Sequence, residues 1–70
     1  MERIYVESTN LSSVGYDEDS CTLEVEFHKG GVYQYYDVPK YVFEGLMAAQ
    51  SKGSYFDQNV KKENYTCKRV

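Results

Sequence analysis

The clearest pattern in the chain is a strict alternation of apolar and polar residues from Thr22 to His28. Leu23, Val25 and Phe27 share one face of an extended segment, and the residues between them are glutamates. Alternation with a period of two is typical of a strand with one buried face. We therefore predict a strand here whose apolar face contributes to the core.

Shorter strands are expected on both sides of this segment. Residues 4–6 favour β structure and end at Ser8-Thr9-Asn10, whose side chains bond to the backbone in turns. Residues 11–16 are predicted to form a second short strand or an irregular edge that Gly15 bends. Residues 65–69 form a closing β-like segment that can return to an edge of the sheet.

The expected hairpin turn is Lys29-Gly30-Gly31, and its length decides the facing of Tyr33 and Tyr35. A two-residue loop would place both tyrosines opposite glutamates on the polar face. A three-residue loop with a left-handed glycine would place them beside the apolar residues of the preceding strand. We favour the three-residue loop because the adjacent glycines can adopt the positive φ angle it requires. Gln34 and Tyr36 would then be exposed.

One main helix is expected after the hairpin, from Pro39 to about Gln50. Pro39 suits the first helical position, where its missing amide costs nothing. Gly45 lowers the helix propensity by about 1 kcal/mol relative to alanine, which indicates a close approach to the sheet or to a ligand. Apolar residues at three-and-four spacing give this helix one buried stripe. The stripe consists of Val42, Phe43, Leu46, Met47 and Ala49.

A short second helix of about two turns is expected after Gly53, which ends the first one. Ser54 can cap this helix, with Asp57 three residues later as a short capping box. Phe56 and Val60 would then pack inward.

The composition suits one small domain over residues 1–70. The predicted fold class is α+β, with a small, mostly antiparallel sheet of about four strands packed by one main helix and a short second helix. The aromatic residues are eight tyrosines and three phenylalanines, and tyrosine rings commonly lie half buried or at an interface.

The net charge of −3 is unevenly distributed. Two basic residues oppose eight acidic ones up to Val38, which gives −6, and six basic residues oppose three acidic ones from Pro39 onward, which gives +3. An acidic balance does not favour nucleic acid binding by counterion release. The separation of charge would let the basic end meet an anion, or let copies of the chain stack head to tail.

No apolar run is long enough for a membrane span or a signal peptide, so we expect a cytoplasmic protein without membrane contact. Cys21 and Cys67 lack the density and spacing of a disulfide framework and are predicted to be free thiols. The alternative is a disulfide between them, if the two cysteines lie on adjacent strands. Two thiols without histidine partners cannot complete an ordinary zinc site, so we expect no metal and no cofactor.

Residues that could carry catalysis are sparse. The lone histidine, His28, lies at a hairpin end with no nucleophile or orienting partner in view. Acidic residues before Cys21 oppose a reactive thiolate. The run Asp17-Glu18-Asp19 matches no cation-binding loop, and Lys29-Gly30-Gly31 lacks the helix of a phosphate loop. We therefore expect that the protein is not an enzyme.

Three segments carry a recognisable combination of residues, Ser12 to Asp17, Gly30 to Pro39 and Ala49 to Asp57. Together they resemble the KTSC domain, a short module found alone in bacterial and phage proteins and at the C-terminus of some lysyl-tRNA synthetases. Tyr33 and Tyr35 match the Tyr-x-Tyr element of this family, and with Pro39 they are expected to be chiefly structural. The resemblance covers almost the whole chain and implies a binding module for which RNA binding is suggested.

The segment from Ser51 to Lys61 is the candidate ligand-binding surface, because a helix N-terminus there meets lysines and an aromatic ring. Lysines would bind an anion, and a tyrosine would stack on a base. The candidate residues are Lys52, Ser54, Tyr55, Lys61 and Lys62. Ordinary capping between two helices is the alternative interpretation of this segment.

Three hypotheses for function remain open, all of them non-enzymatic binding. The resemblance favours RNA or another nucleotide-bearing ligand, and the acidic balance favours a protein partner. The third hypothesis is a phage-encoded protein that inhibits a host factor or sequesters a nucleotide signal, with a homo-oligomer as one form of it.

Overall fold

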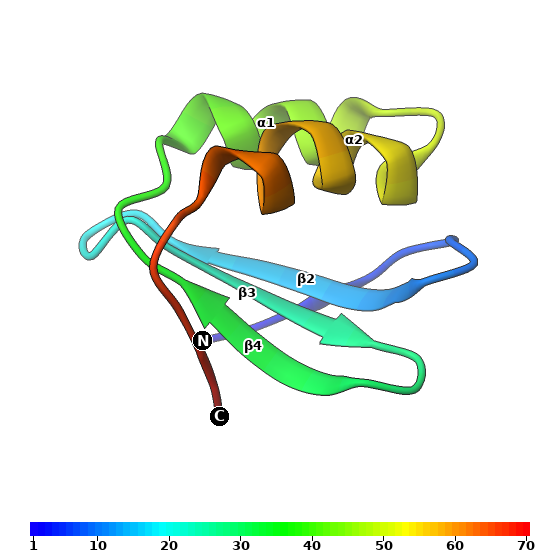
Figure 1. Ribbon diagram of the computed structural model, residues 1–70, viewed down its shortest axis with the longest axis horizontal. Coiled ribbons are helices and arrows are strands. Elements are labelled where there is room, and N and C mark those ends of the chain that lie inside the picture. The colour runs from blue at the N-terminus through cyan, green and yellow to red at the C-terminus, as the bar shows by residue number, and fades with distance from the viewer.

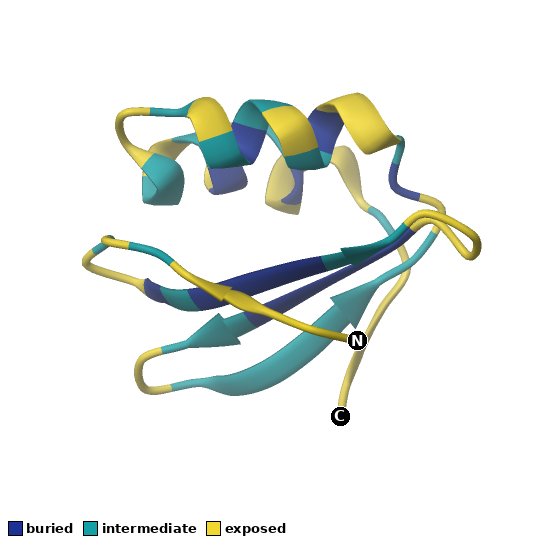
Figure 2. Ribbon diagram, turned by 180° about the vertical axis from the view of Figure 1, so that it is seen from behind, coloured by how far each residue is buried: buried dark blue, intermediate teal, exposed yellow.

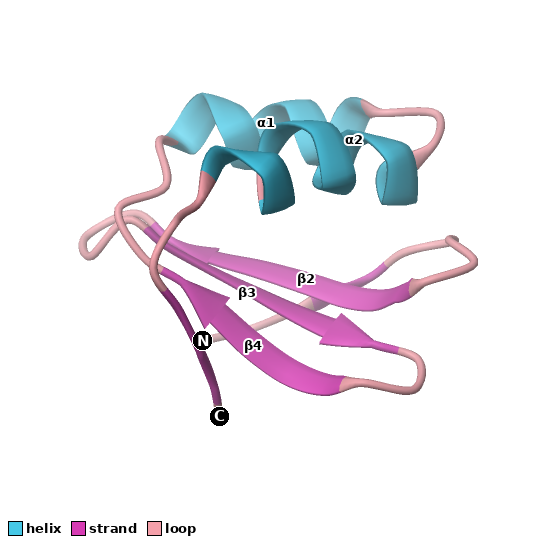
Figure 3. Cartoon of the chain, viewed as in Figure 1, coloured by secondary structure: helices cyan, strands magenta, loops and turns pink.

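The protein is a five-stranded antiparallel sheet with two helices packed on one of its faces (Figure 1; Figure 3). The computed structural model describes residues 1–70. The strands are β1 (Ile4–Tyr5), β2 (Leu11–Asp17), β3 (Thr22–Phe27), β4 (Gly31–Tyr35) and β5 (Cys67–Arg69). The helices are α1 (Lys40–Ala48), α2 (Lys52–Asn59) and the short 3-10 helix η1 (Lys61–Glu63). The predicted α+β class is confirmed, with five strands rather than about four.

The strands follow one another across the sheet in the order β1-β2-β3-β4-β5, and every pairing is antiparallel. The fifth strand arises because the closing segment returns from the helices and pairs with β4. Tyr33 lies opposite Arg69, and Tyr35 lies opposite Cys67. Both ends of the chain lie on the side of the sheet away from the helices (Figure 1).

The β3–β4 hairpin has a three-residue loop, as predicted, but the loop is His28-Lys29-Gly30 rather than Lys29-Gly30-Gly31. Its register sets Tyr33 opposite Val25 and Tyr35 opposite Leu23. Gly31, which follows the loop, has a φ angle of 83°, a conformation that glycine adopts without steric cost. Both tyrosines therefore point to the face of the sheet that the helices cover.

The core lies between the sheet and the helices. Figure 2 shows the buried residues along the middle strands and on the sheet-facing sides of the helices. The buried apolar residues are Leu11, Val14, Leu23, Val25, Val38, Val42, Leu46, Phe56 and Val60. Leu23, Val25 and Leu46 are fully buried, which confirms their predicted place. Phe27, also predicted for the core, is only half buried at the end of β3.

The helix ends differ from the predicted ones. Pro39 is the N-cap of α1 rather than its first helical residue, and α1 ends at Ala48 instead of near Gln50. Ser51, not Ser54, caps α2, because the Ser51 hydroxyl accepts a hydrogen bond from the Ser54 amide at 3.4 Å. No helix has the length and apolar character that a membrane crossing requires.

The opposite face of the sheet carries a network of polar side chains. Arg3 Nε donates to Ser13 Oγ at 2.9 Å, and the same hydroxyl donates to Glu26 Oε1 at 2.9 Å. Arg3 also forms an ion pair with Glu24, which accepts a second hydrogen bond from Gln34 Nε2 at 2.8 Å. The network lets the face without helices bury the Glu24 carboxylate with its hydrogen bonds satisfied.

The two cysteines lie in different parts of the fold. Cys21 is in the turn between β2 and β3, and Cys67 is in β5. Both are exposed free thiols. The alternative of a disulfide required adjacent strands, and the structure does not supply them, since β5 pairs with β4 alone.

Candidate functional site

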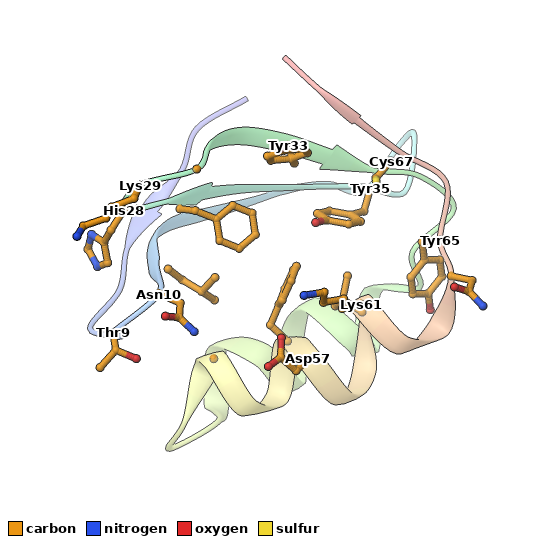
Figure 4. A pocket seen from close by; sticks show the side chains of 17 residues that line it. Thr9, Asn10, His28, Lys29, Tyr33, Tyr35, Asp57, Lys61, Tyr65 and Cys67 are labelled. Atoms are coloured by element: carbon orange, nitrogen blue, oxygen red, sulfur yellow. The ribbon is translucent and has the colours of Figure 1, made fainter.

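A cleft of about 750 Å³ opens between the sheet and α2 (Figure 4). Residues of β3, β4 and β5 form one wall, and residues of α2 and η1 form the other. The β3–β4 loop and the segment before β2 close one end. The lining combines aromatic rings with a few polar and charged side chains, which is typical of sites for small organic ligands.

The sheet wall of the cleft is built on tyrosine rings held by aromatic contacts. Tyr33 meets Phe27 edge to face with centroids 5.8 Å apart. Tyr35 meets Phe56 of α2 in the same way at 5.4 Å. Both tyrosines remain half buried and line the cleft. Each tyrosine therefore packs against a neighbouring ring and also contributes to the surface of the cleft.

Tyr35 is neutral over the whole physiological pH range. Burial, with smaller effects of the neighbouring Cys67 and Tyr33, raises the pKa of its phenol to about 12. A protonated phenol can donate a hydrogen bond as well as accept one. Tyr35 thus offers the cleft a ring and a donor without a charge.

The helical wall carries two charged residues of opposite sign. Asp57 and Lys61 both line the cleft, and Figure 4 shows them extending from α2 and the turn after it. They do not pair with each other, because the two ion pairs of the chain, Arg3 with Glu24 and Lys40 with Glu18, lie elsewhere. Both charges are therefore available to a ligand.

The hairpin end of the cleft carries Asn10, His28 and Lys29. The backbone amide of His28 donates to the Asn10 carbonyl at 3.0 Å, and its Nε2 lies 2.9 Å from the Ser8 carbonyl oxygen. A carbonyl oxygen can only accept, so the ring nitrogen is the donor in this contact. His28 joins the hairpin to the segment before β2 through this contact, and Lys29 is exposed beside it.

Comparison with known proteins identifies the family. The KTSC domain profile matches residues 7–65. The chain belongs to the KTSC domain family. A KTSC domain protein of Yersinia pestis with a solved crystal structure is 39% identical, and it superimposes with a TM-score of 0.92 over 99% of this chain and 96% of that one.

Other relatives of this KTSC domain include a stand-alone protein and part of a larger enzyme. A protein of Stutzerimonas stutzeri is 40% identical over 70 residues, which is 100% of this chain and 99% of that protein. A lysine–tRNA ligase of Nostoc punctiforme is 38% identical over 55 residues, which is 79% of this chain but only 10% of the ligase. The resemblance found in the sequence is confirmed, including its relation to these ligases.

Two of the predicted binding residues have structural tasks in the KTSC domain. Lys52 Nζ donates to the carbonyl oxygens of Met47 at 3.0 Å and Ala49 at 2.9 Å, and so it closes the C-terminal end of α1. Tyr55 packs across α1 against Gly45. Neither residue lines the cleft, because α1 engages both side chains.

The other three predicted residues are not assembled into one site. Ser54 is exposed near the start of α2, whereas Lys61 and Lys62 follow its C-terminal end in η1. The expected gathering of lysines around the N-terminus of α2 is therefore wrong, since the helix separates them. Of the five predicted residues, only Lys61 lines the cleft.

Sequence reasoning missed several residues of the cleft. No motif in the sequence marks Asn10 or Lys29 as a ligand contact, and the sequence predicts a chiefly structural role for Tyr33 and Tyr35. The signal for the tyrosines was the hairpin register, which put them on the helix-covered face. No group of three or more His, Cys, Asp and Glu side chains gathers in this KTSC domain to hold a metal ion.

Proposed function

We propose that this KTSC domain is a non-enzymatic binding module of the cytoplasm that takes single-stranded RNA, or a nucleotide, into the cleft between the sheet and α2. One observation carries the proposal. Two tyrosine rings, Tyr33 and Tyr35, line the same cleft as two lysines without acidic partners, Lys29 and Lys61. Aromatic faces bind bases by stacking, worth about 1–3 kcal/mol per base, and lysines bind the phosphates between them.

The local charges support this choice of cleft despite the net charge of −3. Besides the two lysines, the guanidinium of Arg69 lies against Gly31, the first residue of β4, beside the cleft but not in its lining. A second hollow, beside β1, is lined by Glu2 and Asp17 and has no basic residue. With two or three cations, the salt dependence of binding should be shallow, with a slope of about −0.7 per phosphate contact.

The relatives support an RNA ligand in particular. The lysine–tRNA ligases of Nostoc punctiforme and Trichormus variabilis, 38% and 40% identical over 55 residues, are named for an RNA substrate. A segment that occupies 10% of such an enzyme is too small to perform its chemistry alone. Extra contact with RNA is a task that a module of this size can perform.

Binding of a fluorescein-labelled, mixed-sequence single-stranded RNA, followed by fluorescence anisotropy, tests the proposal. Lys61→Glu should weaken binding by about tenfold or more, equivalent to about 1.4 kcal/mol. Lys62→Glu is the matched control, because it makes the same charge change on the adjacent residue outside the cleft. Both lysines are exposed, so neither change should shift the melting temperature much.

The outcomes separate the hypotheses. A larger loss with Lys61→Glu than with Lys62→Glu supports the cleft, and equal losses would indicate binding by overall charge. Absence of RNA and nucleotide binding would overturn the proposal.

A protein partner is the second candidate, because Tyr41 on the outer side of α1 is 72% exposed and aromatic residues are enriched at interfaces. Tyr41→Ala should then abolish capture of the partner and leave RNA binding unchanged. Sedimentation velocity over a range of protein concentrations tests whether the protein forms a homo-oligomer.

A further inference from the structure

Asp57 is the acidic residue of the cleft, and the fold gives its side chain no task. It lies on α2, it is exposed, and it lines the cleft. Capping of α2 is performed by Ser51, so the expected capping role of Asp57 is not used. Its carboxylate also forms no ion pair with Lys61, one helical turn further along. A carboxylate of this kind, opposite tyrosine rings, is a ready acceptor for hydrogen-bond donors of a ligand.

We infer that Asp57 makes the cleft selective for guanine, an inference that rests on the proposed function. Phe56 of α2 already packs on Tyr35, so a base stacks on the part of the sheet wall that Phe56 leaves open. From there its edge can face the helical wall from which Asp57 extends (Figure 4). An ionised carboxylate offers two acceptor oxygens and no donor. The Watson–Crick edge of guanine presents two neighbouring donors, the N1–H and the N2 amino group, which match those oxygens.

The other bases lack this pair of neighbouring donors. Adenine and cytosine each present one amino group beside a ring nitrogen that accepts, and uracil presents one N–H between two carbonyl oxygens. Each of them sets a lone pair against the carboxylate of Asp57, which is unfavourable in a partly desolvated cleft. A phosphate is repelled by the same charge, so it is directed toward Lys29 or Lys61 rather than toward Asp57.

Titration of the full chain with the four nucleoside monophosphates tests the inference, with affinities from isothermal titration calorimetry. Guanosine monophosphate should bind about 5- to 150-fold more tightly than the others, the range for one good bidentate contact. Asp57→Asn should remove this preference, because the amide replaces one acceptor by a donor. Asp19→Asn is the matched control, since it makes the same charge change in an exposed turn away from the cleft.

Oligonucleotides distinguish a free nucleotide from an RNA strand as the source of the guanine. A short oligoribonucleotide with one guanine should bind more tightly than the same strand with adenine in its place. If the preference appears with the oligonucleotides as well as with the monophosphate, the ligand is a strand, and if it appears with the monophosphate alone, the ligand is a nucleotide. Either result supports the role of Asp57.

Equal affinities for the four nucleotides would overturn the inference and leave the proposed function standing. An unchanged guanine preference in Asp57→Asn, with a melting temperature equal to that of the unmodified chain, would also overturn it. If no nucleotide and no RNA binds, both the inference and the proposed function are wrong.

Discussion

The phenol of Tyr55 occupies the space beside Gly45 in which a side chain at that position would lie. A Cβ atom built on Gly45 would be 2.7 Å from Tyr55 Cζ, well inside van der Waals contact, and closer still to the hydroxyl oxygen. The glycine in α1 therefore admits the aromatic ring of α2, and the two helices share one layer over the sheet (Figure 3). The close approach expected at Gly45 is to a neighbouring helix rather than to the sheet or a ligand.

Gly45→Ala should destabilise the protein, although alanine is the better helix former by about 1 kcal/mol. Overpacking against the ring should cost about 1–3 kcal/mol, which exceeds that gain. Urea unfolding followed by circular dichroism measures the change. In a Tyr55→Leu background the smaller side chain should make Gly45→Ala neutral or stabilising. A stabilising Gly45→Ala in the unmodified chain would contradict the packing described.

Tyr35→Ser should lower the free energy of unfolding by about 1–3 kcal/mol, because it removes a half-buried ring that packs on Phe56. Tyr36→Ser is the matched control. The hydroxyl of Tyr36 donates to Gln34 Oε1 at 3.0 Å on the opposite face of the sheet, so this change should cost less. Equal losses of stability in the two variants, measured by thermal unfolding, would show that Tyr35 does not belong to the packed face.

Acid should weaken the fold through Glu24. The pKa of its carboxyl lies below the ordinary value of 4.5, first because Gln34 donates to it and then because Arg3 lies beside it. A lowered folded-state pKa contributes stability that is present above pH 4.5 and is lost as the pH falls through the folded-state value. Glu24→Gln should therefore reduce stability at neutral pH and flatten the decline in acid.

Denaturant unfolding of the chain at neutral and at acid pH measures this effect. Glu18→Gln is the control, because it breaks the exposed ion pair with Lys40 and should change stability little at either pH. If the free energy of unfolding falls as steeply in acid in Glu24→Gln as in the unmodified chain, other carboxylates cause the decline.

Alkali should weaken the fold through Tyr16. Its hydroxyl donates to the Val38 carbonyl at 2.5 Å, and its ring stacks on Phe43 with centroids 5.2 Å apart. Burial, with a smaller effect of Cys21, raises the pKa of this phenol from 10.0 to about 12. A raised folded-state pKa contributes stability that is present below pH 10 and is lost as the pH rises through about 12.

Ultraviolet titration of the phenols checks this prediction. Tyr16→Phe should remove one phenol that ionises late and reduce the loss of stability in alkali. At neutral pH the same change should cost about 1 kcal/mol, the value of one hydrogen bond. If the late-ionising phenols are as numerous in Tyr16→Phe as in the unmodified chain, the pKa of Tyr16 is not raised and the prediction is wrong.

The positions of the strands and helices followed from local patterns. Alternation in β3 and the three-and-four spacing in α1 each depend on residues close together in the chain, and the adjacent glycines predicted the three-residue loop. The exact helix ends were harder to predict from the sequence. Ser51 and Ser54 are both good caps by residue type, and the choice between them depends on the path of the chain between the two helices.

The site was predicted poorly because it depends on contacts between distant segments. Lysines near a helix N-terminus suggested an anion site, but Lys52 instead donates to the last carbonyls of α1 and Tyr55 fills the space above Gly45. Spacing in the sequence cannot show which lysine a neighbouring helix will engage. It also cannot show at which end of α2 the sheet and the helix leave a cleft.

The sequence by itself determined the family and the antiparallel α+β architecture, because periodicity and turn residues act over a few neighbouring positions. It favoured the inward facing of Tyr33 and Tyr35 but left the loop length open, and the strand register decided it. Only the tertiary structure decided that these tyrosines share a cleft with Asp57 and Lys61. The physical reason is that side chains from β4 and from the end of α2 meet only after the sheet and the helices have packed on a common core, and that packing also determines which polar groups are left without a partner.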